Sequence, residues 1–193
     1  MSYSFRQYEH LNGPRLTLKR VEAEDLISLA NALISSTTWF SQTRNITTPE
    51  IFRTYFEKIL ARETLPLAAI YQGEFVGMSV FQYPTENFTR VEIGFSWVSD
   101  QWQRTFVNSE MKFLMLGYAF EVMKVKRVEF SVHPDNVKSN DAMKRLGATF
   151  EGMLRKWRFL PGLVPDDGNR NIYSILDDEW PEIQARLKSV LSR

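Results

Sequence analysis

Cysteine is absent from this chain of 193 residues. Its absence excludes disulfide bonds, thiolate nucleophiles and zinc sites built on thiolates. Histidine is almost as scarce, since His10 and His133 are the only two, so we expect no metal site. The longest stretch without a charged residue, 26–43, is rich in Ser, Thr and Asn and is not expected to span a bilayer. The first residues, MSYSFRQYEHLNGPR, lack the apolar segment of a signal peptide. We therefore expect a cytoplasmic protein without membrane contact.

An excess of either charge is also missing. Lys and Arg number 24 and Asp and Glu number 23, for a formal net charge of +1. A chain so balanced is a poor candidate for binding nucleic acid through its phosphates, so we expect no nucleic-acid partner. Hydrophobic residues make up 44% of the sequence, which is typical of a folded globular protein. The length is that of one domain, and we expect residues 1–193 to form it.

The pattern of apolar and polar residues predicts strands and helices in a definite order. Two helices follow the first strand, three strands come next, and a helix then separates the last of these from the next strand. This order predicts a mixed sheet of the α/β (α+β) class with helices on both faces. The predicted strands are 15–21, 67–71, 75–83, 88–98, 127–133, 149–160 and 171–176, and the predicted helices are 22–33, 48–60, 108–123, 139–147 and 178–191.

Local signals fix several of these ends. Thr48 followed by Pro49 is typical of a helix start. Gln72-Gly73 predicts a tight hairpin between two strands. Asn108 and Ser139 are predicted to cap the two helices that they begin.

Four segments in the second half resemble one enzyme superfamily, the GNAT acyl-CoA N-acetyltransferases. Their order and spacing, together with the predicted elements, are similar to that superfamily over about residues 12–187. The form of the third and fourth segments resembles the branch that acetylates the N-termini of ribosomal proteins. The segments are VEIGFSWV (91–98), VNSEMK (107–112), NVKSNDAMKRLGATFEGMLR (136–155) and YSILDDEWP (173–181).

The resemblance implies a mostly antiparallel sheet of about seven strands, splayed between strands four and five. Acetyl-CoA, the implied co-substrate, would place its pantetheine arm in the splay and its pyrophosphate at the start of the following helix. Trp97 and Val98 would lie beside the pantetheine, and a backbone N–H from one of them would polarise the thioester carbonyl. The residues implied to bind the pyrophosphate are Gln103, Arg104, Thr105, Phe106, Val107 and Asn108.

The pyrophosphate loop departs from the superfamily pattern Gln/Arg-x-x-Gly-x-Gly/Ala. Gln101 fits its first position, but Arg104 and Phe106 stand where small residues are usual. Two interpretations follow. Either the loop has lost its phosphate contacts, or the Arg104 guanidinium supplies charge directly while Phe106 packs under the helix or against the cofactor. We favour the second, because the adjoining residues remain similar to the superfamily.

Glu92 and Ser139 are the candidate catalytic residues. Glu92 lies within a predicted strand, where a carboxylate can take the proton of an ammonium substrate; the alternative is that it points to solvent. Ser139 is explained by helix capping alone, but the resemblance adds a role as proton donor to the leaving thiolate. The tyrosine that many members use is replaced by Met143. The resemblance also implies that Asn136, otherwise a turn residue, binds the pantetheine arm.

The sequence thus predicts an acetyl-CoA-dependent N-acetyltransferase that acts by direct attack of a bound primary amine. The acceptor is either a protein N-terminus or a small molecule, and a homodimer is left open. A catalytically silent domain that binds acyl-CoA or a protein partner is the main alternative. An unrelated α/β ligand-binding module is a third interpretation with less support.

Overall fold

The structure is a computed structural model, and it describes residues 5, 8, 10–34, 46–60, 63–85, 87, 89–158 and 167–192. Within this part of the chain, eight strands form one sheet in the order β1-β2-β3-β4-β5-β6-β8-β7. The pair β5–β6 is parallel and every other neighbouring pair is antiparallel. The strands are β1 (His10–Asn12), β2 (Thr17–Arg20), β3 (Thr64–Tyr71), β4 (Glu74–Gln82), β5 (Arg90–Val98), β6 (Arg127–Val132), β7 (Thr149–Leu154) and β8 (Arg170–Leu176).

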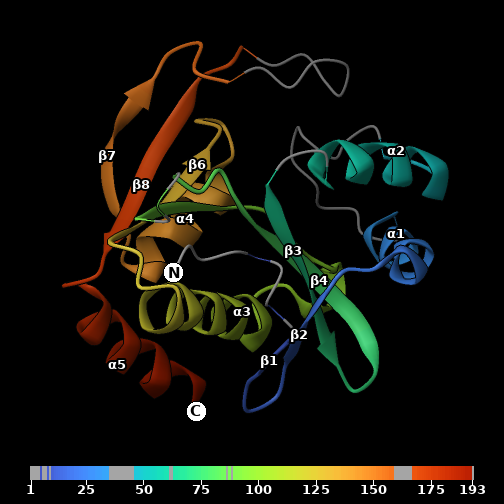
Figure 1. Cartoon of the computed structure of the whole chain (residues 1–193), viewed down its shortest axis with the longest axis horizontal. Helices are drawn as coiled ribbons and strands as arrows, with labels where there is room; N and C mark the ends of the chain where they lie inside the picture. The colour runs from blue at the N-terminus through green and yellow to red at the C-terminus, as the bar shows by residue number, and fades with distance from the viewer. Residues whose placement is uncertain are drawn as a thin grey trace.

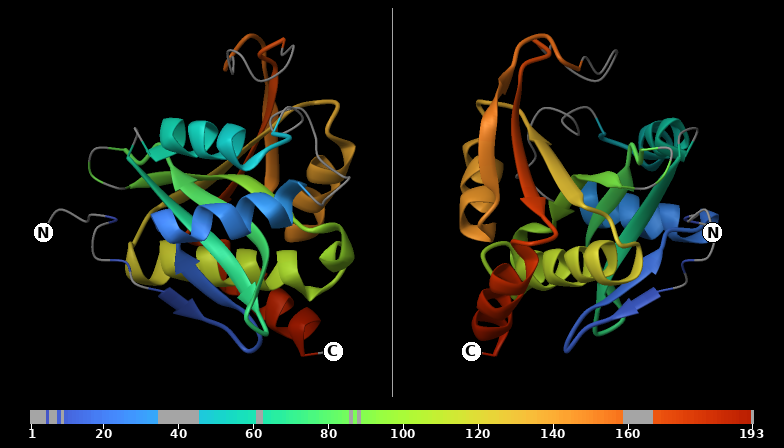
Figure 2. Two further views of the ribbon diagram at one scale, coloured as in Figure 1. Left: turned by 90° about the vertical axis from the view of Figure 1, so that its right-hand side faces the viewer. Right: turned by 60° about the vertical axis from the view of Figure 1, so that its left-hand side comes forward.

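Helices cover both faces of this sheet, as predicted (Figure 1). The helices α1 and α2 pack on one face, and α3, α4 and α5 lie on the opposite face, with α4 alongside β8 (Figure 2). The helices are α1 (Leu26–Ile34), α2 (Pro49–Leu60), α3 (Phe106–Gly117), α4 (Val137–Leu146) and α5 (Trp180–Leu191). The end of α3 continues as one π-helical turn, Tyr118–Val122.

The hydrophobic core consists of two clusters, one on each face of the sheet. The larger one joins the sheet to α3, α4 and α5 and includes Phe81, Met111 and Ile175. The smaller one joins the sheet to α1 and α2 and includes Leu29, Phe52 and Val80. Alternate residues of one strand therefore serve opposite faces, because successive side chains of a strand point to opposite sides.

Local sequence signals correctly predicted one helix start and one hairpin turn, but they did not predict the first strand. Thr48 accepts a hydrogen bond from the Ile51 N–H at 3.4 Å, and α2 begins at Pro49 as predicted. Gln72 and Gly73 both have positive φ, 50° and 84°, as the central residues of a type I′ hairpin turn require. The strand β1 was not predicted, because its three residues are too few to display an alternation.

The start of β2 is tied to α3 by a buried carboxylate. Glu110 has no exposed surface and accepts N–H bonds from the backbone of Arg15 and Leu16, both at 2.8 Å. The Arg15 guanidinium adds a contact at 2.9 Å to the second oxygen. The first turns of α3 are thereby held against the sheet from which the site is built.

Candidate active site

The parallel strands β5 and β6 part after a short pairing. Arg90, Val91 and Glu92 pair with Arg127, Val128 and Glu129, and the register ends there. Both strands continue, β5 to Val98 and β6 to Val132. On the other side of β5, the register with β4 shifts between Met78 and Val80, and Phe95 has a φ of 48°. The bulge turns β5 away from β6, so the predicted splay between these two strands is present.

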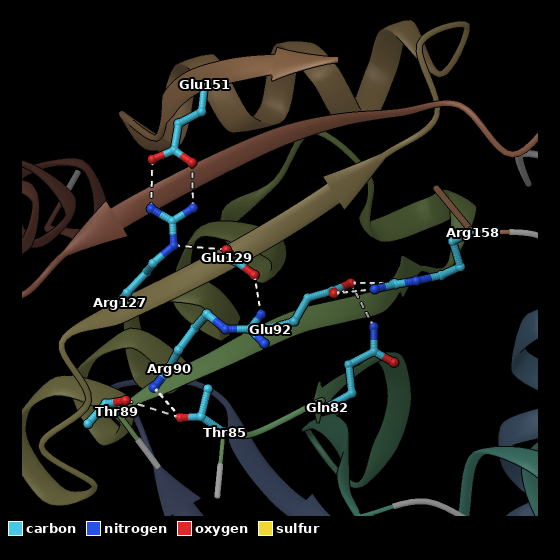
Figure 3. Close-up of polar contacts among 9 residues, drawn as sticks. All are labelled: Gln82, Thr85, Thr89, Arg90, Glu92, Arg127, Glu129, Glu151 and Arg158. Carbon is cyan, nitrogen blue, oxygen red and sulfur yellow. Dashed lines mark hydrogen bonds and ion pairs between the residues drawn. The ribbon is translucent and has the colours of Figure 1, made fainter. Parts of the chain in front are cut away.

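Glu92 is the last residue of β5 that pairs with β6, and it is buried with 3% of its surface exposed. The alternative that Glu92 points to solvent is therefore wrong. Gln82 donates its Nε2 hydrogen to Glu92 Oε1 at 2.9 Å. Arg158 donates to both carboxylate oxygens, at 2.9 Å and 2.8 Å (Figure 3). The carboxylate is thus held at a fixed position by three donors.

Arg158 reaches Glu92 from the segment after β7, 66 residues away in sequence. Its guanidinium carbon lies 4.4 Å from the centre of the Tyr83 ring, in cation–π geometry. Burial opposes its charge, but the hydrogen bonds and the charge of Glu92 outweigh this effect and raise the pKa of Arg158. The Arg158 guanidinium therefore stays charged and in contact with Glu92, the candidate base.

A row of charged side chains continues from this point across β5, β6 and β7 (Figure 3). Arg90 donates to Glu129, and Arg127 donates to Glu129 at 2.8 Å and to Glu151 at 2.6 Å. The hydrogen bonds from Arg127 lower the pKa of Glu151 to about 2. These four residues, which we call the charged row, contain two cations and two anions.

The loop before α3 has an unusual backbone. Arg104 is exposed and has a φ of 61°, the left-handed region that glycine adopts most easily. This is the position at which the family pattern has its first glycine, so the arginine retains the glycine-like conformation. Thr105, not Asn108, caps α3: its hydroxyl accepts the Val107 N–H at 3.4 Å and donates to the Trp102 carbonyl at 2.6 Å. The prediction for Asn108 is wrong, because the helix begins two residues before it, at Phe106.

Phe106 packs under the start of α3. Its ring lies 5.2 Å from the ring of Tyr71 and 6.2 Å from that of Trp102, and the Arg15 guanidinium lies 4.0 Å from its centre. The Gln103 amide donates to the Val98 carbonyl at 3.1 Å, which ties the loop to the end of β5. The second glycine position of the pattern is therefore filled by a ring that stabilises the loop.

The turn between β6 and α4 is organised by asparagines. Asn136 is the cap of α4 and accepts the Ser139 N–H at 3.1 Å, so the prediction that Ser139 is the cap is wrong. Asn140, which is buried, donates to the carbonyl of His133 at 3.0 Å and to that of Asn136 at 2.8 Å. Ser139 is half-buried in the first turn of the helix, and its hydroxyl is not the cap.

The predicted residues lie on β5, on the loop and first turn of α3, and at the start of α4. Trp97 and Val98 pair with Met78 and Gly77 of β4, on the side of β5 away from β6. Among the described contacts, none joins Ser139 to Glu92. The sequence suggests acceptor loops around residues 35–47 and 160–170, and these lie mostly outside the described residues. Trp39, Phe40 and Phe159, which are candidates to line the acceptor site, also lie outside them.

A cavity of about 640 Å³ adjoins the loop before α3. It is bordered by α1, by the β3–β4 turn and by the start of that loop, with Ser28, Gly73 and Gln101 among its lining residues. It does not include Glu92 or Ser139, so we treat it as a neighbour of the candidate site.

Two residues of the site region were missed from the sequence, half-buried Arg158 and buried Lys112. Arg158 gave no signal, because its partner is far away along the chain. Lys112 gave one: it lies one turn before Leu116 on the apolar stripe of α3, where a lysine is out of place. Lys112 has 1% of its surface exposed.

Comparison with known proteins decides the family. Residues 15–149 match the model of the acetyltransferase (GNAT) domain. This chain belongs to the GNAT acetyltransferase family. An uncharacterized N-acetyltransferase of Bacillus subtilis (strain 168), YoaA, is 29% identical over 103 residues, which span 53% of this chain and 56% of that relative.

Solved GNAT structures share the fold. A protein of T. thermophilus, named provisionally as an acetyltransferase, matches with a TM-score of 0.83 and 28% identity over 95% of this chain and 97% of its own. RimL, named as a ribosomal L7/L12 α-N-protein acetyltransferase in complex with coenzyme A, matches with a TM-score of 0.70 and 21% identity over 89% of this chain and 99% of its own. No helix in the described part of the chain combines the length and the apolar character that a bilayer crossing requires.

Proposed function

We propose that this GNAT domain transfers an acetyl group from acetyl-CoA to a primary amine by direct attack. The observation that carries the proposal is the buried Glu92 carboxylate at the point where β5 and β6 part. A carboxylate there adjoins the place where the thioester of the family's co-substrate would lie. Acetyl-CoA supplies the activated acetyl group, and the residues around it have three tasks.

The first task is to bind the co-substrate, and several groups fit it. The N-terminus of α3 offers backbone N–H groups and a positive dipole end for the pyrophosphate, and Arg104 adds a positive charge beside it. Along the parted strands, the Ser131 hydroxyl and the Trp97 indole N–H are buried without a hydrogen-bond partner in the described part of the chain. Polar groups that are buried without a partner can form hydrogen bonds with a ligand's amides, the Trp97 indole N–H as a donor, because burial without a partner is costly.

The second task is to remove a proton from the incoming ammonium. Arg158 occupies both oxygens of Glu92 in this structure. A substrate ammonium is also a cation with N–H donors, so it can replace the guanidinium on Glu92. Glu92 then takes the proton, and the neutral amine can attack the acetyl carbon.

The third task is to protonate the departing thiolate. Met143 stands at the position of the tyrosine that many members use, and it is buried. Ser139, three residues beyond the cap Asn136, is the hydroxyl residue of α4 and the candidate proton donor. Its role in this step is part of the proposal.

The charged row supports one choice of acceptor class. The charged row offers paired cations and anions along β5, β6 and β7, as an extended polar chain would need. The name of RimL, whose fold this chain shares, gives a protein N-terminus as acceptor for that protein. A peptide N-terminus is therefore our first acceptor to test, with small amines second.

The ion pair on Glu92 also favours a second candidate function, a silent domain that binds acyl-CoA. Titration with acetyl-CoA in a thermal-unfolding experiment tests binding, since a ligand of the native state raises Tm. Thiol release in the presence of peptides and small amines then tests transfer. A rise in Tm without amine-dependent thiol release would favour the silent domain, and no rise in Tm would contradict both.

A further inference from the structure

Lys112 and two serines form a closed cluster beside the bulge of β5. Lys112 Nζ donates to Ser79 Oγ at 2.9 Å and to Ser96 Oγ at 2.5 Å. The two hydroxyls are themselves 2.8 Å apart. Each of the three groups thus contacts the other two, and they come from α3, β4 and β5.

The environment of Lys112 is unusual for a lysine. The side chain is buried, and its two hydrogen-bond partners in the described part of the chain are uncharged hydroxyls. Burial lowers the pKa of Lys112 to about 7. Near neutral pH a large share of this amine is therefore unprotonated, and an unprotonated amine can accept a proton from a hydroxyl.

The two serines differ in exposure. Ser79 has no exposed surface, whereas Ser96 is exposed. Ser96 follows the bulge residue Phe95 and lies beyond the last β5–β6 pair, so it stands along the parted strands. Its side chain meets α3, while Glu92 meets Arg158, so the cluster is separate from the candidate base.

A cluster of this composition fits nucleophilic catalysis. A serine hydroxyl attacks an acyl group only when a base takes its proton, and a desolvated lysine is one such base. A purely structural cluster, which would only fix the bulge, does not require its outer serine to be exposed. We propose that Ser96 is an acyl-accepting nucleophile, with Lys112 as its base and Ser79 as a proton relay between them.

Acylation and hydrolysis together conserve atoms and charge. Ser96 Oγ forms a bond to the acyl carbon of a thioester, the carbon–sulfur bond breaks, and the serine proton passes to Lys112 Nζ, directly or through Ser79. Lys112 then returns that proton to the departing thiolate. Water attacks the resulting ester and releases a carboxylic acid, and the serine regains a proton. The outcome is hydrolysis of the acyl thioester when no amine is bound, an activity beyond amine transfer that rests on the proposed binding of acetyl-CoA.

The test measures acylation of the protein directly. The full chain is mixed with acetyl-CoA, or with p-nitrophenyl acetate as a smaller donor, quenched with acid and examined by intact-mass and peptide mass spectrometry. We expect one acetyl group on Ser96 and slow thiol release without amine. Both should be lost in S96A and retained in S189A, a matched change of an exposed serine on α5. K112M should slow acylation by about 10²-fold, as expected for the loss of a general base.

Each other outcome overturns the inference. Acetylation of Lys112 instead of Ser96, or equal acylation of Ser96 in K112M, contradicts the assigned roles. If Ser96 forms no ester with either donor, and acetyl-CoA gives no thiol release that depends on Ser96, the nucleophile is contradicted. If circular dichroism shows that K112M does not fold, S79A replaces it and is expected to slow acylation. Two measurements separate this failure from a failure of the proposed function. Calorimetry with S96A measures whether acetyl-CoA binds. The nitrophenyl ester tests Ser96 as a nucleophile even where acetyl-CoA does not bind.

Discussion

Arg158 and Glu92 form a two-point ion pair in which each carboxylate oxygen accepts one N–H bond, at 2.9 Å and 2.8 Å. The Glu92 side chain is 4% exposed and the Arg158 side chain 22% exposed, so the pair is largely shielded from water. Removal of one partner therefore leaves a buried charge without compensation. The pair both positions the candidate base and competes with the substrate for it.

Loss of Arg158 should lower the stability of the protein, and a neutral residue in place of Glu92 should restore part of it. We expect R158M to lower the free energy of unfolding by about 3 kcal/mol, since Glu92 is left buried and unpaired. The double variant E92Q/R158M should recover part of this loss, because the glutamine carries no charge. Urea denaturation of the four proteins of this cycle measures the coupling. Strictly additive effects would show that the two residues do not stabilise each other.

Arg104 should affect stability and cofactor binding in opposite ways. Its left-handed backbone costs a residue with a Cβ about 1–2 kcal/mol, so R104G should increase stability by about 1 kcal/mol after the entropy of glycine is counted. The same change removes a positive charge from the expected pyrophosphate site. We expect R104G and R104E both to weaken acetyl-CoA binding, R104E by roughly ten- to hundredfold. Calorimetry on the folded variants measures this, and an unchanged affinity would remove Arg104 from the site.

Ser139 and Asn136 can be separated by their different roles at the start of α4. N136A deletes the cap and should lower the free energy of unfolding by about 0.5–2 kcal/mol. S139A removes only a hydroxyl from the first turn, so we expect stability to be kept while amine-dependent thiol release slows. Chemical denaturation and steady-state kinetics on both variants give the comparison. Normal turnover in S139A would show that another group, such as water, protonates the thiolate.

Glu151 should make stability depend on acid pH. Its pKa in the folded protein is lowered from 4.5 to about 2, first of all by hydrogen bonds from Arg127. A lowered folded pKa gives stability that is present above the unfolded pKa and is lost as pH falls from about 4.5 toward 2. We therefore expect the advantage of the natural protein over E151Q to shrink across that range. Thermal unfolding at a series of pH values measures it, and a constant difference would contradict the ion pair with Arg127.

Local patterns predicted the fold well, because most elements carry their own signal. The hairpin at Gln72-Gly73 and the start of α2 are at the predicted places. The splay that the family resemblance implied lies between β5 and β6, but the sequence did not predict that the pairing would end at Glu92. Helix caps were harder, since several polar residues within one turn can each serve. Thr105 and Asn136 are the caps where Asn108 and Ser139 were predicted.

The environment of the site could be predicted only in part. Glu92 was found because it interrupts an apolar strand. Arg158 was not, since a contact across 66 residues depends on how the segment after β7 returns to the sheet. The position of Lys112 on the apolar stripe of α3 could have singled it out, but its serine partners follow from the bulge in β5, which the sequence alone does not locate.

The central claim is that Glu92 takes the proton of the acceptor amine. The most direct measurement is the pH dependence of amine-dependent thiol release from acetyl-CoA, compared between the natural protein and E92Q. Glutamine keeps the shape and still hydrogen-bonds, but it cannot accept a proton, so we expect turnover to fall by about 10²–10⁴-fold near neutral pH with acetyl-CoA affinity unchanged. The difference should narrow as pH rises, because more of the amine is then already neutral. Full activity of E92Q, or a loss that is the same at every pH, would contradict the account.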